Sequence, residues 1–94
     1  MKIKILQGFS SKFNKQLNYI ALDKPAAARK FRNDVLLEIE DIIKMPYKNR
    51  RSIYFADDNI RDLIFKGYII IYRIKSEVLE IEIFGFIKYT DNPY

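Results

Sequence analysis

The chain has 94 residues, of which 49% are hydrophobic and 15% aromatic, and this length and composition predict a single domain over residues 1–94 with one real core. Cysteine and histidine are both absent, which excludes disulfides, thiolate and imidazole metal sites, and Ser-His-Asp or Cys-His catalysis. No apolar run approaches the roughly 18 residues of a membrane span. Any acid–base chemistry would fall to Asp, Glu, Lys or Tyr, assisted by Arg.

The net charge of +5 at pH 7 favours an anionic partner, either nucleic acid or an acidic protein segment. The positive charge is spread along the chain rather than concentrated in one tract, so a well-solvated, lysine-rich surface explains it equally well. The lack of cysteine fits a cytoplasmic protein. Composition therefore leaves a binding role and plain solubility both open.

The first half of the chain predicts one strand and two helices. Residues 2–7 alternate between polar and apolar side chains, as is typical of a short strand at the edge of a sheet. Apolar residues then recur every four positions, which predicts an amphipathic helix over about 10–22, capped by Ser10 or Ser11. A second helix is expected over about 25–45, because one proline opens it and another closes it. Its buried stripe should consist of Ala28, Phe31, Val35, Ile39 and Ile42.

The second half of the chain predicts a meander of three or four strands, followed by a polar, aromatic tail over 88–94. The strands are expected at about 52–56, 60–66, 68–74 and 78–87. Only Gly67 separates the two middle strands, which indicates a tight turn with positive φ at Lys66 and Gly67. The third of them is apolar on both faces, as a central strand would be. Together these elements predict an α+β fold, in which an antiparallel helical hairpin packs across a twisted, mainly antiparallel sheet.

The loop after the second predicted helix is both basic and aromatic. It carries Lys48, Arg50 and Arg51 between Tyr47 and Tyr54. Such a loop could hold phosphates by charge and stack on bases. A solvated basic loop is the plainer interpretation.

Two arginines and two tyrosines are further candidates for binding. Arg61 and Arg73 are expected on adjacent strands and on one face of the sheet. They would then either contact a partner or pair with glutamates of the last strand. Tyr89 and Tyr94 are exposed candidates in the tail, although chain termini often fray.

Several short motifs follow one another in a fixed order along the chain. A proline and three alanines open the second helix at 25–28, Pro46 closes it, and the basic loop follows. An Arg-x-Leu strand comes next at 61–63, and then Gly-Tyr-x-Ile-x-Tyr-Arg at 67–73. In this order and at this spacing, the motifs resemble the RelE/ParE superfamily of bacterial type II toxins over nearly the whole chain. The resemblance implies a growth-inhibiting toxin of a toxin–antitoxin system, of the kind linked to plasmid stabilisation, with no cofactor and no metal ion.

The superfamily divides into two activities. RelE-like members cut mRNA on the ribosome with a basic cluster and a tyrosine, whereas ParE-like members lack that cluster and act on DNA gyrase. Where the nuclease members carry cations, this chain has Ile60, Asp62 and Ile69. The resemblance therefore favours the ParE-like branch, with a toxin that binds its target without catalysis.

Two alternatives remain open, because the closing segment 85–93 lacks the histidine and arginine that are usual in ParE-like chains. The first is a RelE-like, ribosome-dependent mRNA endonuclease, whose site would use Lys88, Tyr94 and Arg61. The second is a degenerate, non-toxic member that keeps only antitoxin binding.

The expected partner is a cognate antitoxin with an acidic or amphipathic segment that folds over the helical hairpin and the sheet. The resemblance adds DNA gyrase as the target, or the ribosome and its mRNA under the nuclease alternative, and no membrane. Residues that could contact antitoxin or target are Arg61, Arg73, Lys48, Arg50, Arg51, Lys88, Tyr89 and Tyr94.

Overall fold

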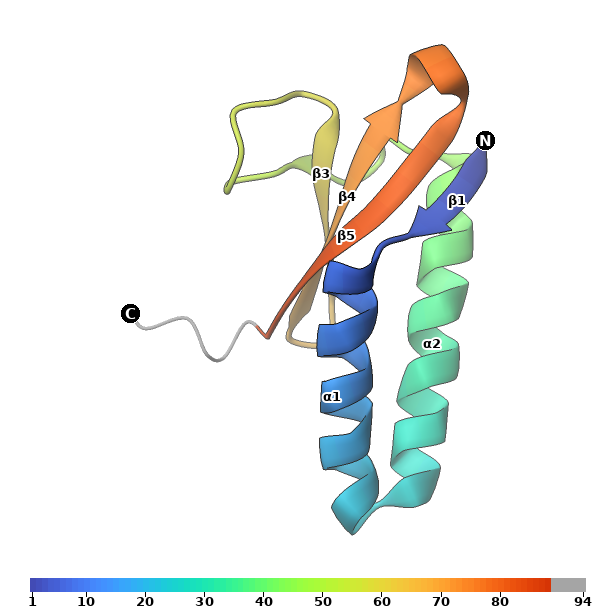
Figure 1. Ribbon diagram of the computed structural model, residues 1–94, viewed down its shortest axis with the longest axis vertical. Coiled ribbons are helices and arrows are strands. Elements are labelled where there is room, and N and C mark those ends of the chain that lie inside the picture. The colour runs from blue at the N-terminus through green and yellow to red at the C-terminus, as the bar shows by residue number, and fades with distance from the viewer. Residues whose placement is uncertain (89–94) are drawn as a thin grey trace.

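The structure is a computed structural model that describes residues 1–88. Two helices form a hairpin along one face of a five-stranded sheet, and the turn of the hairpin extends past the end of the sheet (Figure 1). The predicted α+β class, with its mainly antiparallel sheet, is confirmed. Within the described residues, no helix combines the length and the apolar character that a membrane crossing needs. The elements are β1 (Lys2–Ile5), α1 (Gln7–Asp23), α2 (Pro25–Lys44), β2 (Arg50–Arg51), β3 (Ile60–Phe65), β4 (Tyr68–Lys75), the 3₁₀ turn η1 (Ser76–Val78) and β5 (Glu80–Lys88).

The strands lie in the order β1-β5-β4-β3-β2. β1 is an edge strand, as predicted, and runs parallel to β5, whereas the other neighbouring pairs are antiparallel. β4 lies in the middle, in agreement with its apolar character on both faces. The turn between β3 and β4 has positive φ at Lys66 (48°) and at Gly67 (83°), as the sequence predicts.

The main core lies between the hairpin and the sheet. All five residues of the stripe predicted on α2 are buried, and Val35 is completely so. From α1, the rings of Phe9 and Phe13 stack with their centroids 5.1 Å apart, and both meet Phe86 of β5 edge-on. Each fully buried side chain of this size contributes about 1.5–3 kcal/mol, so packing dominates the attachment of the hairpin to the sheet.

The opposite face of the sheet, called the helix-free face below, carries a smaller apolar cluster. No helix of residues 1–88 packs on it (Figure 1). The loop between β2 and β3 covers part of the cluster, since the ring of Phe55 meets that of Phe84 edge-on at 5.6 Å. The members of the cluster are Ile60, Ile69 and Ile71, with Phe84 and Ile87 packed against them.

The strand expected over 52–56 is wrong. The structure has a two-residue strand at Arg50–Arg51 instead, and the chain then bends away from β3. The reason is local, because the backbone amide of Ile53 donates to the side-chain carboxylate of Asp62 rather than to a neighbouring strand. A buried side chain therefore replaces the strand ladder at this point.

Two other boundaries differ from the prediction. α1 begins at Gln7, directly after β1, with Leu6 at the N-cap position and no side-chain cap. The hydroxyl of Ser10 donates to the Leu6 carbonyl at 3.4 Å, so this serine bonds within the helix and does not cap it. β5 begins two residues later than expected, because η1 precedes it.

Candidate functional site

The register of β3 and β4 decides where the two candidate arginines lie. Arg61 is opposite Tyr72, and Arg73 is opposite Ile60. Because successive residues of a strand project from opposite faces, the two arginines lie on different faces of the sheet. The expectation that they share one face is therefore wrong.

Arg61 joins two loops. Its Nε donates to the carbonyl oxygen of Asp58 at 2.9 Å, and one Nη donates to that of Asn49 at 3.1 Å. Its guanidinium also lies over the ring of Tyr47, 4.9 Å from the centroid. These contacts connect the segment after α2 to the turn before β3. Arg61 thus stabilises loops through backbone carbonyls, and it does not pair with a glutamate of β5.

The hydroxyl of Tyr72 closes the core beside these loops. It donates to the carbonyl oxygen of Pro46 at 2.6 Å and accepts a hydrogen bond from the side-chain amide of Asn49 at 3.1 Å. Burial raises the pKa of Tyr72, and the hydrogen bond from Asn49 offsets only part of this effect. The phenol therefore stays protonated at neutral pH and serves to anchor the chain after α2.

Arg73 pairs with a glutamate of β5, which was one of its two expected roles. Its Nη1 lies 3.0 Å from Oε1 of Glu82, and Nζ of Lys75 lies 3.2 Å from Oε2 of the same carboxylate. The Arg73 guanidinium also lies over the ring of Phe84, 4.9 Å from the centroid. Glu82 is only 7% exposed, so two cations neutralise a nearly buried carboxylate on the helix-free face.

This cluster should make the stability of the fold depend on acidity. Burial by itself raises the pKa of Glu82, but hydrogen bonds from Lys75 and Arg73 outweigh it and hold the pKa below the ordinary 4.5. A carboxyl group with a lowered folded-state pKa stabilises the fold above its unfolded-state pKa, and this contribution is lost as the pH falls through the folded-state pKa.

We therefore expect the free energy of unfolding of Glu82→Gln to fall less than that of the wild type between about pH 6 and pH 3. Urea denaturation at a series of pH values measures the difference, with Glu40→Gln, at an exposed position on α2, as the matched control. Parallel pH profiles for the wild type and Glu82→Gln would contradict the assigned role of this carboxylate.

The basic loop does not form a single cationic patch. Arg50 pairs with Asp62 at 3.2 Å, and Arg51 pairs with Asp58 at 2.7 Å. Lys48 is exposed and stands apart from these two pairs. Two of the three candidate cations are thus already paired with acids, Arg50 with Asp62 on β3 and Arg51 with Asp58 in the turn before it, which agrees with the plainer, structural interpretation.

The positions that carry cations in the nuclease branch are buried here. Ile60 is 3% exposed, Asp62 1% and Ile69 0%, and all three project toward the helix-free face. Oδ2 of Asp62 accepts hydrogen bonds from Arg50 and from the amide of Ile53, while its Oδ1 has no partner within residues 1–88. Each of the three positions carries an apolar or an anionic side chain, so none of the three supplies a cation to a phosphate group.

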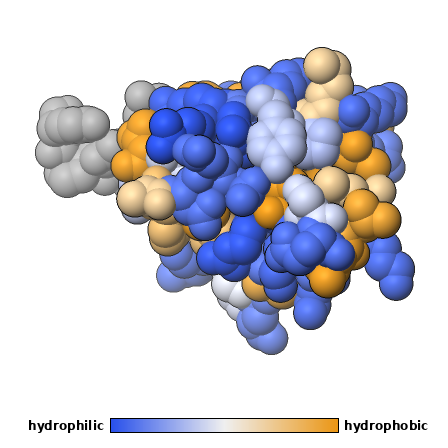
Figure 2. Space-filling view, turned by 90° about the horizontal axis from the view of Figure 1, so that it is seen from above, coloured by the Kyte–Doolittle hydropathy of each residue, from blue (hydrophilic) through white to orange (hydrophobic). Residues whose placement is uncertain are grey.

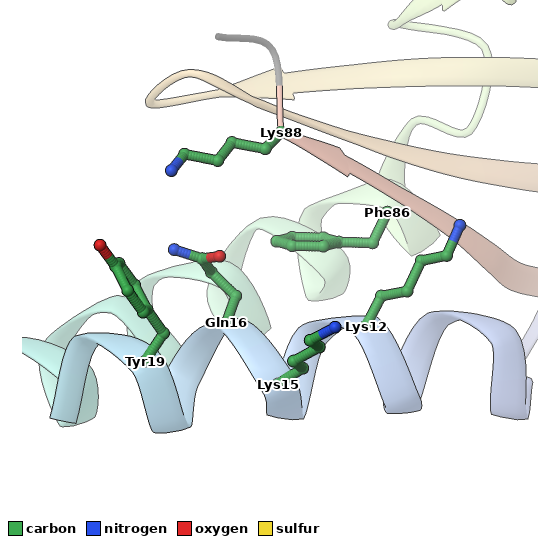
Figure 3. Close-up of a pocket in the computed structure, with 6 residues that line it drawn as sticks. All are labelled: Lys12, Lys15, Gln16, Tyr19, Phe86 and Lys88. Atoms are coloured by element: carbon green, nitrogen blue, oxygen red, sulfur yellow. The ribbon is translucent and has the colours of Figure 1, made fainter. Parts of the chain in front are cut away.

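A groove of about 360 Å³ lies between α1 and the end of β5. Its floor is the nearly buried ring of Phe86, and Tyr19 stands at one end of it (Figure 3). Nζ of Lys88 lies 5.9 Å from the centroid of the Tyr19 ring, and the side chain of Gln16 donates to the Tyr68 hydroxyl at 3.0 Å. We call this feature the lysine groove, and the residues that line it are Lys12, Lys15, Gln16, Tyr19, Phe86 and Lys88.

The sequence analysis named Lys88 as a candidate binding residue, but it did not name the residues of α1 that line the same groove. A signal was present, because Lys12, Lys15 and Tyr19 follow the spacing that brings residues onto one face of a helix. What the spacing does not reveal is that β5 brings Lys88 to the same place. The remaining candidates, Tyr89 and Tyr94, lie outside the described residues.

The opposite end of the molecule has a mixed surface. Figure 2 looks onto the end that bears the turn between β4 and β5, where hydrophilic residues dominate and the apolar residues form separate, smaller patches. Exposed apolar side chains in this part of the chain include Val78, Leu79 and Ile53.

Comparison with known proteins decides the family. The family model for the ParE toxin of the type II toxin–antitoxin system parDE matches residues 3–90 of the chain. The chain belongs to the ParE toxin family. The superfamily expected from the sequence motifs is thereby confirmed, and this ParE-family chain is a toxin of the type II class.

A solved structure agrees with this membership. The ParE-family chain is similar to a chain described as the chromosomal ParDE TA system from P. aeruginosa, with a TM-score of 0.75 and 14% identity. The likeness covers 94% of this chain and 95% of the other. At that level of identity it shows a shared fold. No curated protein sequence matches the chain.

Proposed function

We propose that the chain inhibits bacterial growth by binding DNA gyrase, that it does not cleave RNA, and that a cognate antitoxin neutralises it. The observation that most supports the absence of RNA cleavage is the burial of Ile60, Asp62 and Ile69. In the nuclease branch these positions carry cations, and here they are nearly inaccessible to solvent. The ParE family match supports the gyrase-directed branch over the nuclease branch.

The chemistry of RNA cleavage explains why these positions matter. A base must remove the proton of the ribose 2′-hydroxyl, and cations must stabilise the negative charge that develops on the phosphate. Losing one such donor typically costs about 10²–10³ in rate, and here three positions provide none. Asp62 instead contributes a buried carboxylate, and this carboxylate forms an ion pair with Arg50.

The test is expression of the chain in bacteria without its antitoxin. We expect filamentous cells with DNA damage, together with loss of DNA supercoiling activity when the purified chain is added to gyrase. Primer extension on transcripts from the same cells should show no new cleavage sites. Codon-phased cuts that vanish in Lys88→Ala would overturn the proposal in favour of the mRNA endonuclease, and normal growth would indicate a degenerate, non-toxic member.

The antitoxin part of the proposal has a separate test. We expect the protein encoded beside this chain to co-purify with it and to restore growth when the two are co-expressed. A basic toxin with exposed apolar side chains favours an acidic partner that covers part of its surface. A chain that is recovered from its native operon stable, soluble and unaccompanied would contradict this part.

A further inference from the structure

The lysine groove concentrates positive charge that the described chain does not neutralise. Lys12, Lys15 and Lys88 all line it, and none of its lining residues is acidic. Within residues 1–88, none of the three ammonium groups has a carboxylate within ion-pair distance. Three like charges around one hollow repel one another, so an anion that enters the groove lowers the electrostatic free energy.

Three cations of β4 and of the turn before it are paired with acids, unlike the lysines of the groove. Arg73 and Lys75 of β4 share the carboxylate of Glu82, and Lys66 in the turn between β3 and β4 pairs with Asp34 of α2 at 3.1 Å. Lys88 of β5 instead lies beside the aromatic ring of Tyr19. Within residues 1–88, the three lysines of the groove thus lack the carboxylate partners that Arg73, Lys75 and Lys66 have.

A second hollow continues this surface along α1. It has a volume of about 410 Å³, lies at the turn of the hairpin and shares Tyr19 with the lysine groove. Leu22 is 86% exposed there and Tyr19 is 67% exposed. We call it the apolar hollow after Ile20 and Leu22. Tyr19, Asp23 and Lys24 also line it, so it carries one acidic and one basic side chain.

We propose that the lysine groove and the apolar hollow together bind one acidic, amphipathic protein segment. Its carboxylates lie against Lys12, Lys15 and Lys88, and its apolar side chains lie against Tyr19 and Leu22. The proposal rests on the proposed function, in which the partner with such a segment is the antitoxin. It assigns that segment to the outer face of α1 and the end of β5.

The combination of charge and apolar surface favours a protein segment over nucleic acid. Lysines beside an exposed tyrosine would suit phosphates and stacked bases as well. However, an exposed leucine at the end of the same surface offers a nucleic acid no favourable contact, whereas an amphipathic segment buries it. Lys12 and Tyr19 are seven residues apart, so the groove spans roughly 10 Å of helix, which is about two turns of a helical peptide.

The experiment measures binding of the full chain to the protein encoded beside it, by titration calorimetry and stopped-flow fluorescence at about 50 mM and about 300 mM salt. We expect the double variant Lys12→Glu with Lys15→Glu to bind at least about tenfold more weakly at low salt, with a slower association rate and a smaller difference at high salt. Leu22→Ala should also bind about tenfold more weakly, but through faster dissociation and with an unchanged salt dependence.

The controls lie elsewhere on the hairpin. Lys44→Glu reverses a charge at the far end of α2, and Leu37→Ala removes another exposed leucine side chain, which is 60% exposed, from α2. Both should bind like the wild type. All substituted residues are exposed, so each variant should keep the circular dichroism spectrum of the wild type.

The outcomes separate this inference from the proposed function. If the neighbouring protein binds the wild type, and the groove and hollow variants bind it equally well, the assigned surface is wrong while the toxin–antitoxin pairing stands. If it does not bind the wild type at all, the pairing fails and the surface assignment fails with it. A single-stranded oligothymidylate of about 12 nucleotides is titrated in parallel. Oligonucleotide binding that the lysine variants abolish, with partner binding unaffected, would overturn the inference in favour of nucleic acid.

Discussion

Phe31→Ala is expected to lower the free energy of unfolding by about 3–5 kcal/mol. The ring of Phe31 lies between the hairpin and the sheet, with its centroid 6.1 Å from that of Phe13, 6.4 Å from that of Phe65 and 4.9 Å from that of Tyr68. Removing it leaves a cavity lined by three aromatic rings, which cannot close up without moving a helix or a strand. A loss of this size is a large part of the ~5–15 kcal/mol that stabilises a typical domain.

Urea denaturation of the variant and the wild type measures this effect. Leu37→Ala is the matched control, because Leu37 lies on the same helix and is 60% exposed, and it should change the free energy by no more than about 0.5 kcal/mol. If Phe31→Ala does not change the urea concentration at the midpoint of unfolding, α2 must contact the sheet through a different face.

The buried stripe of α2 could be predicted because all the signals that define it lie within or next to the helix. Two prolines set the ends of the helix, and the apolar residues between them repeat at the helical period. Ala28, Phe31 and Val35 are then buried as soon as the helix packs its apolar face against the rest of the domain. The turn at Lys66 and Gly67 was predictable for the same reason, since a two-residue turn with glycine has few possible conformations.

The placement of Arg61 and Arg73 could also have been derived from that turn. A two-residue turn at 66–67 pairs Phe65 with Tyr68, and counting outward from this pair sets Arg61 opposite Tyr72. Arg73 is then one position further along and projects from the other face. The information was present in the sequence, and the register had only to be counted.

The lysine groove and the loop after β2 are different, because each depends on contacts between distant parts of the chain. The groove exists because β5 ends beside α1, and no periodicity within α1 indicates where β5 ends. The strand expected over 52–56 is absent because the amide of Ile53 donates a hydrogen bond to the side chain of Asp62, which follows later in the sequence. Tertiary contacts of this kind override strand propensity.

The contact between Arg50 and Asp62 gives the second large effect. Arg50→Ala is expected to lower the free energy of unfolding by about 3–5 kcal/mol, because it leaves the carboxylate of Asp62 buried without a cation. The Asp62 side chain is 0% exposed, and Oδ1 already lacks a hydrogen-bond partner within residues 1–88. The side chain of Arg50 is itself 37% exposed, so solvent reaches this ion pair from the side of the arginine only.

Arg51→Ala is the matched control for this prediction. Arg51 is the next residue in the chain and also pairs with an aspartate, but both side chains of that pair are mostly exposed, at 64% and 74%. Its loss should cost under ~1 kcal/mol, since solvent screens exposed ion pairs. Equal effects of the two substitutions would contradict the importance assigned to burial.

The double variant Arg50→Met with Asp62→Leu separates the buried charge from the contact itself. Replacing both partners of a buried ion pair by apolar side chains is often neutral, whereas removing one partner leaves an uncompensated charge. We therefore expect the double variant to be more stable than Arg50→Ala, although it carries one more substitution. The amide of Ile53 loses its acceptor in the double variant, so its hydrogen exchange should become faster while the core amides of β4 keep their protection. A double variant less stable than Arg50→Ala would mean that the hydrogen bond from Ile53, and not the buried charge, dominates the role of Asp62.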